Sequence, residues 1–70
     1  MEQLKVFYDA TGHTITVWFD DPQLEHVSEE TADEVVLMKD RTGRVIGFEK
    51  LSFTLTDPDH VRLQFETVGA

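Results

Sequence analysis

The sequence predicts a mainly β protein: a single small antiparallel sheet or partly closed barrel of about six strands, built from hairpins, with at most one short helical turn. First, a turn occurs twice, since Asp9–Gly12 and Asp40–Gly43 share the pattern Asp-x-Thr-Gly. Second, apolar and β-branched residues alternate with polar ones beside these turns, which is the period of a half-buried strand. Third, no stretch has the pattern of an amphipathic helix that could cover such a sheet.

Both turns have the residues of a tight hairpin connection. The Asp side chain accepts hydrogen bonds from backbone N–H groups two residues further on, and Gly adopts a positive φ without a steric clash. We therefore expect a type I turn with a left-handed Gly at Gly12 and at Gly43. Aspartic proteases use paired Asp-Thr-Gly sequences, but Ala10 and Arg41 separate the Asp from the Thr here, which argues against that activity.

The alternation of apolar residues sets the expected strands. Ile46 and Phe48 are apolar at even positions, whereas Leu51, Phe53 and Leu55 are apolar at odd positions. Because a shift of one residue reverses the two faces of a strand, the chain must bulge, bend or cross near Glu49 and Lys50. We expect six strands, over Leu4–Tyr8, His13–Phe19, Glu34–Lys39, Arg44–Lys50, Leu51–Thr56 and His60–Glu66.

The segment after Pro22 is harder to interpret. Pro22 has no N–H to donate and ends the second strand. We expect residues 23–33 to be mostly loop, with a short strand over Glu25–Glu29 or a helical turn at Ser28–Thr31 as alternatives. A turn is expected at Thr56–Asp59, where Pro58 restricts the backbone.

Length and composition limit the classes of protein to consider. A chain of 70 residues forms one domain, residues 1–70, and buries only about 60% of its unfolded surface. It has no Cys, so it has neither a disulfide nor a thiolate. No signal peptide or membrane span is visible, and we expect a cytoplasmic protein. No Gly-rich phosphate loop or Ser/His/Asp set stands out, so we expect no cofactor and assign no catalytic residue.

The charge is strongly acidic. The chain has 14 acidic and 6 basic residues, a formal net charge of −8, which disfavours nucleic acid and anionic membranes as partners. It suits a basic protein partner. Seven of the acidic residues lie between Asp20 and Glu34, where there is no Lys or Arg. This segment is either a solvated loop or an acidic docking surface.

A sheet with one apolar side must bury that side, so we expect a homodimer or larger oligomer. Trp18 lies opposite Ile15, Val17 and Phe19 in the alternation and therefore faces a second core layer or an interface. Our first hypothesis is a non-catalytic protein-interaction module. Its expected apolar contacts are Trp18, Phe7 and Met38, and its expected acidic rim is Glu29, Glu30, Asp33 and Glu34.

Parts of the sequence resemble a known family. The stretches Val6–Asp9, Ile15–Phe19 and Gly43–Glu49, together with Asp40, are similar to the domain-of-unknown-function 2283 family of small bacterial and archaeal proteins. The resemblance implies a compact β-rich fold with no established activity. Some members are suspected antitoxins encoded beside small toxins, which would suit an acidic protein that neutralises a basic partner.

A second hypothesis is a small ligand- or metal-binding protein. His13 and His60 each begin a strand after a turn, and Asp57 lies in the second of these turns. If the turns meet at one end of the sheet, imidazole and carboxylate groups could share a divalent ion, with Glu49 as a further carboxylate. However, no pair has the close spacing of a zinc site.

Overall fold

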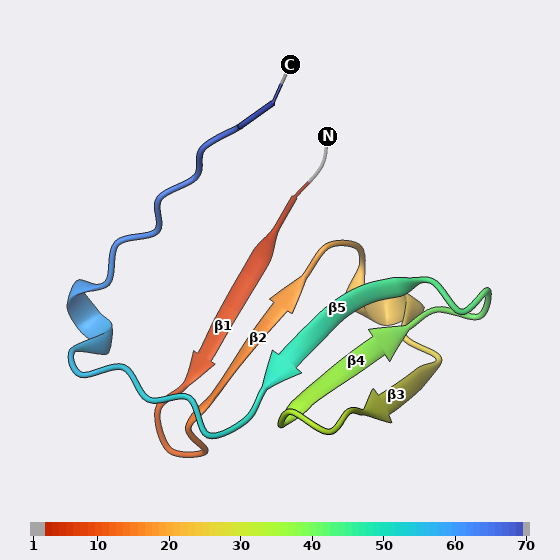
Figure 1. Ribbon diagram of the computed structural model, residues 1–70, viewed down its shortest axis with the longest axis horizontal. Helices are drawn as coiled ribbons and strands as arrows, with labels where there is room; N and C mark the ends of the chain where they lie inside the picture. Colours follow the sequence, from red (N-terminus) through yellow and green to blue (C-terminus); the bar gives the residue numbers. More distant parts are fainter. Residues whose placement is uncertain (1–2, 70) are drawn as a thin grey trace.

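The computed structural model describes residues 3–69 and shows one open antiparallel sheet of five strands (Figure 1). The strands are β1 (Lys5–Asp9), β2 (Thr14–Trp18), β3 (Val27–Glu30), β4 (Val35–Lys39) and β5 (Val45–Lys50), in the spatial order β1-β2-β5-β4-β3. Two short 3₁₀ turns, Pro22–Leu24 and Pro58–His60, complete the regular structure of these residues. The mainly β, hairpin-built fold predicted from the sequence is confirmed.

The sheet has two faces, and both carry apolar residues. The register pairs Val17 with Phe48 and Phe48 with Leu37 on one face, and Trp18 with Gly47 and Gly47 with Met38 on the other. We call the first the Phe48 face; its apolar side chains are Val6, Tyr8, Ile15, Val17, Phe19, Val35, Leu37, Ile46 and Phe48. We call the second the Trp18 face, formed by Phe7, Thr16, Trp18, Val36, Met38, Gly47 and Glu49.

The core is small and sits at the centre of the sheet. Among the described residues, Ile46 and Met38 are the buried apolar side chains, 1% and 5% exposed. A β-bulge interrupts the β4–β5 pairing between Met38 and Lys39, and it leaves Ile46 without a direct partner on β4. The backbone carbonyl of Ile46 instead accepts a hydrogen bond from Phe19 N at 2.8 Å. This bond extends the β2–β5 pairing beyond Trp18.

The predicted strand over Leu51–Thr56 is wrong. Ser52 has a φ of 54°, which turns the chain away from the line of β5. Phe53 N then donates to the His13 carbonyl at 2.8 Å, and Leu55 N donates to the Tyr8 hydroxyl at 2.8 Å. The rings of Tyr8 and Phe53 pack edge to face with centroids 6.2 Å apart. The change of face expected near Glu49 is therefore made by a bend just after β5.

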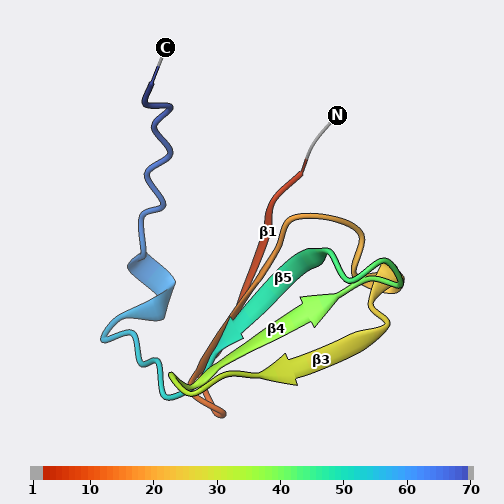
Figure 2. The same cartoon turned by 45° about the vertical axis from the view of Figure 1, so that its right-hand side comes forward.

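The predicted strand over His60–Glu66 is also wrong, because no strand pairs with it in residues 3–69. The segment 61–69, which we call the C-terminal arm, runs apart from the sheet in the direction opposite to β1 (Figures 1 and 2). Its apolar side chains Leu63, Phe65 and Val68 are 77%, 80% and 86% exposed. The alternation that predicted a strand is present in the arm without a neighbour to pack against.

Residues 23–33 are more ordered than expected. The 3₁₀ turn begins at Pro22, where Asp21 accepts a hydrogen bond from Gln23 N at 2.9 Å, and not at Ser28. Val27–Glu30 forms the edge strand β3, which begins two residues and ends one residue later than the alternative strand over Glu25–Glu29. All four residues of β3 are exposed, and its sequence Val-Ser-Glu-Glu lacks the apolar alternation that indicated the other strands. In the described part of the chain, no helix has the length and apolar character needed to cross a bilayer.

The two Asp-x-Thr-Gly turns differ in their left-handed residue. In the second turn Gly43 has a φ of 87°, as expected. In the first turn His13 has the positive φ, 57°, so the prediction for Gly12 is wrong. A Cβ at Gly12 would lie 2.8 Å from Oδ2 of Asp9, so a larger residue there would displace the Asp9 side chain. Asp9 Oδ1 accepts from Thr11 N and Gly12 N, both at 2.9 Å.

The left-handed conformation of His13 makes a stability prediction. The left-handed conformation destabilises the folded chain by roughly 1–2 kcal/mol when the residue is not Gly. Replacement by Gly removes this strain, but part of the gain is lost because Gly gives up more chain entropy on folding. We expect His13→Gly to raise the free energy of unfolding by roughly 0.5 kcal/mol. His13→Ala, which removes the imidazole but keeps the strain, should give no such gain. Urea unfolding of the two variants checks this, and equal effects would contradict it.

Candidate functional site

A groove of about 360 Å³ crosses the Trp18 face of the sheet. Its walls come from β1, β2, β4, β5 and the segment around β3, so the whole width of the sheet contributes. The residues that line it are Phe7, Thr16, Trp18, Glu25, Ser28, Val36, Met38 and Glu49. The structure thus brings together the three apolar contact residues expected from the alternation, Phe7, Trp18 and Met38.

The register explains how the groove is built. One row across the sheet runs Phe7, Thr16, Glu49, Val36, and the next runs Trp18, Gly47, Met38, Ser28. Gly47 is the one residue in these rows without a side chain. A Cβ at Gly47 would lie 2.8 Å from Cε3 of Trp18, so the indole rests directly on the backbone of β5. The missing side chain makes room for the Trp18 ring above Gly47.

Two carboxylates give the groove its charge. Glu49 lies beside Thr16, whose hydroxyl donates to Glu49 Oε2 at 3.4 Å. Glu25 accepts a hydrogen bond from the Ser28 hydroxyl. No Lys or Arg is among the described residues that line the groove. The combination of aromatic and sulfur-containing surface with two carboxylates can hold an apolar group that carries a positive charge beside it.

The expected acidic rim does not gather in one place. Glu29 pairs with Leu37, on the Phe48 face, and forms an ion pair with Lys39 at 2.6 Å. Glu34 lies in the β3–β4 connection, 3.7 Å from Lys50. Asp33 is in the same connection, and its N–H donates to Thr31 Oγ1 at 3.4 Å. Glu30 alone of the four is at a register position of the Trp18 face, opposite Val36.

Sequence reasoning missed part of the groove. The binding surface expected from the sequence did not include Thr16, Ser28 or Glu49, and Glu49 was placed in the alternative ligand site. Thr16 lies on the same face of β2 as Trp18, because the two are two residues apart. Glu49 is the β5 partner of Thr16 and therefore lies on that face too. No sequence signal placed Glu25, which precedes β3 and reaches the groove through the path of the chain after Pro22.

The residues of the metal hypothesis lie in the turns that were expected. His60 Nδ1 is 3.1 Å from the Asp57 carboxylate, and both side chains are exposed. His13 Nδ1 is 3.4 Å from the hydroxyl of Thr54. Within residues 3–69, no three His, Asp or Glu side chains are close enough to hold a metal ion together. The metal hypothesis therefore gains no support from this geometry.

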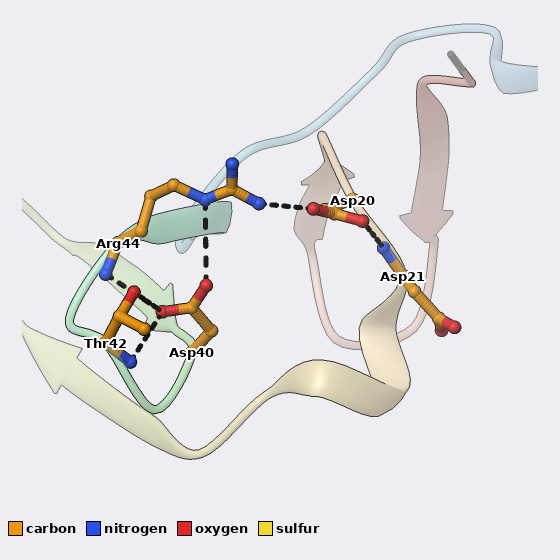
Figure 3. Close-up of polar contacts among 5 residues, drawn as sticks. All are labelled: Asp20, Asp21, Asp40, Thr42 and Arg44. Carbon is orange, nitrogen blue, oxygen red and sulfur yellow. Dashed lines mark hydrogen bonds and ion pairs between the residues drawn. The ribbon is translucent and has the colours of Figure 1, made fainter. Parts of the chain in front are cut away.

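A polar cluster at the other end of the sheet fastens two loops (Figure 3). Arg44 bonds to Asp20, which follows β2, and its Nε lies 3.6 Å from Asp40, in the β4–β5 turn. Asp40 Oδ1 accepts from Thr42 Oγ1 at 2.7 Å, from Thr42 N at 2.9 Å and from Arg44 N at 3.1 Å. The hydroxyl of Thr42, followed by these backbone donors and Arg44, holds the pKa of Asp40 below its usual value of 3.8.

The lowered pKa of Asp40 gives a pH prediction. Because the pKa is lower in the folded than in the unfolded chain, the charged side chain stabilises the fold above about pH 3.9. This contribution is lost as the pH falls through the folded pKa. We expect Asp40→Asn to be less stable than the native chain at pH 7, with the difference shrinking below pH 4. Thermal unfolding from pH 7 to pH 3 measures it, and a constant difference would contradict it.

The fold and the groove define a small open-sheet protein whose candidate site is a surface groove. No family model, curated protein or solved structure matches the chain. The similarity to the domain-of-unknown-function 2283 family, carried by residues of β1, β2 and β5, is left as a proposal.

Proposed function

We propose that the protein is a small acidic protein-interaction module that binds a basic protein partner on its Trp18 face. The observation that supports this most is the groove itself, which places Phe7, Trp18 and Met38 beside Glu25 and Glu49. On this surface Phe7 is exposed and Trp18 is half-buried, whereas Met38 is buried, only 5% exposed.

The residue types fit a binding surface. Trp and other large aromatic residues dominate the binding energy of protein interfaces, particularly at their centres. Met adapts its shape to different apolar groups. Phe7 is 56% exposed, so a partner would cover a ring that is largely in water in the isolated chain. A Lys or Arg that accompanies an apolar anchor on the partner would meet the carboxylates of Glu25 and Glu49.

The charge of the whole chain supports the same class of partner. A formal net charge of −8 attracts a basic protein and speeds the encounter. A cytoplasmic protein of the domain-of-unknown-function 2283 type, acting in the manner of an antitoxin on a small basic toxin, is the specific form of the proposal. We propose that the module acts as an oligomer, because its Phe48 face also carries exposed apolar residues, such as Val6 at 41% and Phe19 at 46%.

A pull-down of the tagged protein from its own cells, quantified by mass spectrometry, tests the proposal. We expect one basic protein near equal stoichiometry with the native chain. Phe7→Ala and Trp18→Ala should each reduce its affinity by about 30-fold or more, which corresponds to at least 2 kcal/mol at a binding hot spot. The matched control is Phe19→Ala, the same change at an aromatic side chain of similar exposure on the Phe48 face.

The charge contribution is tested separately with the recovered partner. Glu25→Gln and Glu49→Gln should weaken binding at low salt and have less effect at high salt, because exposed charges are screened. Equal recovery by the native chain, Trp18→Ala and Phe19→Ala would exclude the Trp18 face as the binding surface. Recovery of self-association alone would exclude a stable partner of another kind.

A further inference from the structure

The C-terminal arm has the side-chain pattern of a strand and no strand beside it. Val61, Leu63 and Phe65 alternate with Arg62, Gln64 and Glu66. The exposed fractions of Leu63 and Phe65, 77% and 80%, are the values of side chains that touch almost nothing. Two large apolar side chains in water, on an alternating segment of this length, are typical of a strand that pairs outside its own chain.

Strand β1 offers the complementary feature, an edge. In residues 3–69, β1 is hydrogen-bonded to β2 only and ends the sheet on that side. Its outward N–H and C=O groups can therefore template another strand. The opposite edge, β3, is shorter and contains Glu29 and Glu30, which makes it a poorer template.

We infer that residues 62–66 of a second copy of this chain pair antiparallel with β1. The register that matches the charges sets Arg62 opposite Asp9 and Glu66 opposite Lys5, an ion pair at each end. Asp9 uses Oδ1 for its own turn, so Oδ2 is the oxygen that Arg62 would approach. Cross-strand pairs of opposite charge stabilise a sheet, whereas like charges destabilise it.

The same register also matches the apolar side chains. It sets Leu63 opposite Tyr8 and Phe65 opposite Val6, both on the Phe48 face. Leu63 would then extend the apolar cluster that Tyr8 forms with Phe53. Gln64 would lie opposite Phe7 on the Trp18 face. A single register thus satisfies both charged pairs and both apolar pairs of the five positions.

The arm runs in the direction opposite to β1 of its own chain (Figures 1 and 2) but does not pair with it, since β1 is hydrogen-bonded to β2 only in residues 3–69. Leu55 N is bonded to the Tyr8 hydroxyl, which fixes the chain near the end of β1, and the 3₁₀ turn Pro58–His60 then begins the arm. From there the arm stays apart from the sheet in both views (Figures 1 and 2). If each copy pairs its arm with β1 of the other copy, the two contacts are identical and the dimer has two-fold symmetry. The inference is independent of the proposed binding of a basic partner.

Disulfide trapping tests the register, because the native chain has no Cys. Phe7→Cys and Gln64→Cys are made as separate variants and mixed under mild oxidation. Residues directly opposite in an antiparallel pair are within disulfide distance, so we expect a cross-linked dimer of one chain of each kind. The control is Thr16→Cys mixed with Gln64→Cys, where one further strand adds about 4.8 Å and should prevent the cross-link.

Light scattering of purified protein supplies the second measurement. We expect twice the mass of one chain for the native protein, and the mass of one chain for the double variant Leu63→Ser, Phe65→Ser. That variant should keep its fold, as judged by circular dichroism, because neither side chain packs on its own sheet. Lys5→Glu should weaken the dimer by about tenfold, and Glu66→Lys in the same chain should restore it.

Three results would overturn the inference. The native chain could have the mass of one chain at every concentration. The cross-link could form only when Phe7→Cys and Gln64→Cys are in one chain, without a dimer, which would show that the arm folds back on its own β1. The arm variants could also leave the dimer intact, which would assign the dimer to another surface, such as the Phe48 face.

Discussion

Ile46→Ala is expected to lower the free energy of unfolding by about 2–5 kcal/mol. Ile46 is 1% exposed and is the large side chain that is fully buried among the described residues. Its removal takes apolar surface out of the core and leaves a cavity that the sheet, which has one layer, fills poorly. A 70-residue domain is stable by roughly 4–10 kcal/mol, so this substitution removes a large share of the total.

Urea unfolding followed by the fluorescence of Trp18, the single Trp of the chain, measures the effect. The conservative control is Ile46→Val, which should cost about 0.5–1.5 kcal/mol. The positional control is Val6→Ala on the same face, where a side chain that is 41% exposed should cost less than Ile46→Ala. Similar losses for Ile46→Ala and Val6→Ala would show that the core is not centred at Ile46.

Much of the fold could be predicted because its four main strands are rich in β-branched and aromatic residues and are bounded by turn residues. Leu4–Tyr8 differs from β1 by one residue at each end, and Arg44–Lys50 differs from β5 by one. The final strands were wrong for a local reason and a global one. The local reason is that Ser52 has a left-handed conformation at a position where no Gly indicates a turn. The global reason is that the C-terminal arm has the pattern of a strand but no neighbouring strand in residues 3–69. Periodicity reports which side chains could be buried, but not what buries them.

The groove was predictable for its apolar residues and not for its charged ones. Alternation within each strand, combined with the pairing of β1, β2 and β4 with their neighbours, places Phe7, Trp18 and Met38 on one face. The acidic residues of the segment before β4 were treated as one group. The edge strand β3 separates them, because neighbouring residues such as Glu29 and Glu30 point to opposite faces.

Gly47→Ala is expected to lower the free energy of unfolding, although a change from Gly to Ala usually raises it. In an ordinary strand position Ala is more favourable than Gly by roughly 0.5–1 kcal/mol. At Gly47 the new Cβ would lie 2.8 Å from Trp18 Cε3 and 2.8 Å from the backbone oxygen of Val17. Crowding of this kind typically costs 1–3 kcal/mol, so we expect a net loss of about 1–2 kcal/mol. Urea unfolding measures it, and a gain in stability would contradict the close packing of Trp18 on β5.

A double-mutant cycle separates the two contacts. If the indole causes most of the strain, Gly47→Ala should cost much less in a Trp18→Ala background, with a coupling above about 0.5 kcal/mol. If the Val17 carbonyl causes it, the cost should be the same in both backgrounds. Gly43→Ala is the control for backbone effects, since Gly43 has a φ of 87° but no atom within 4 Å of a new Cβ. A strong coupling would mean that Gly47 fixes the position of Trp18, so Gly47→Ala should also reduce recovery of the basic partner, whereas Gly43→Ala should not.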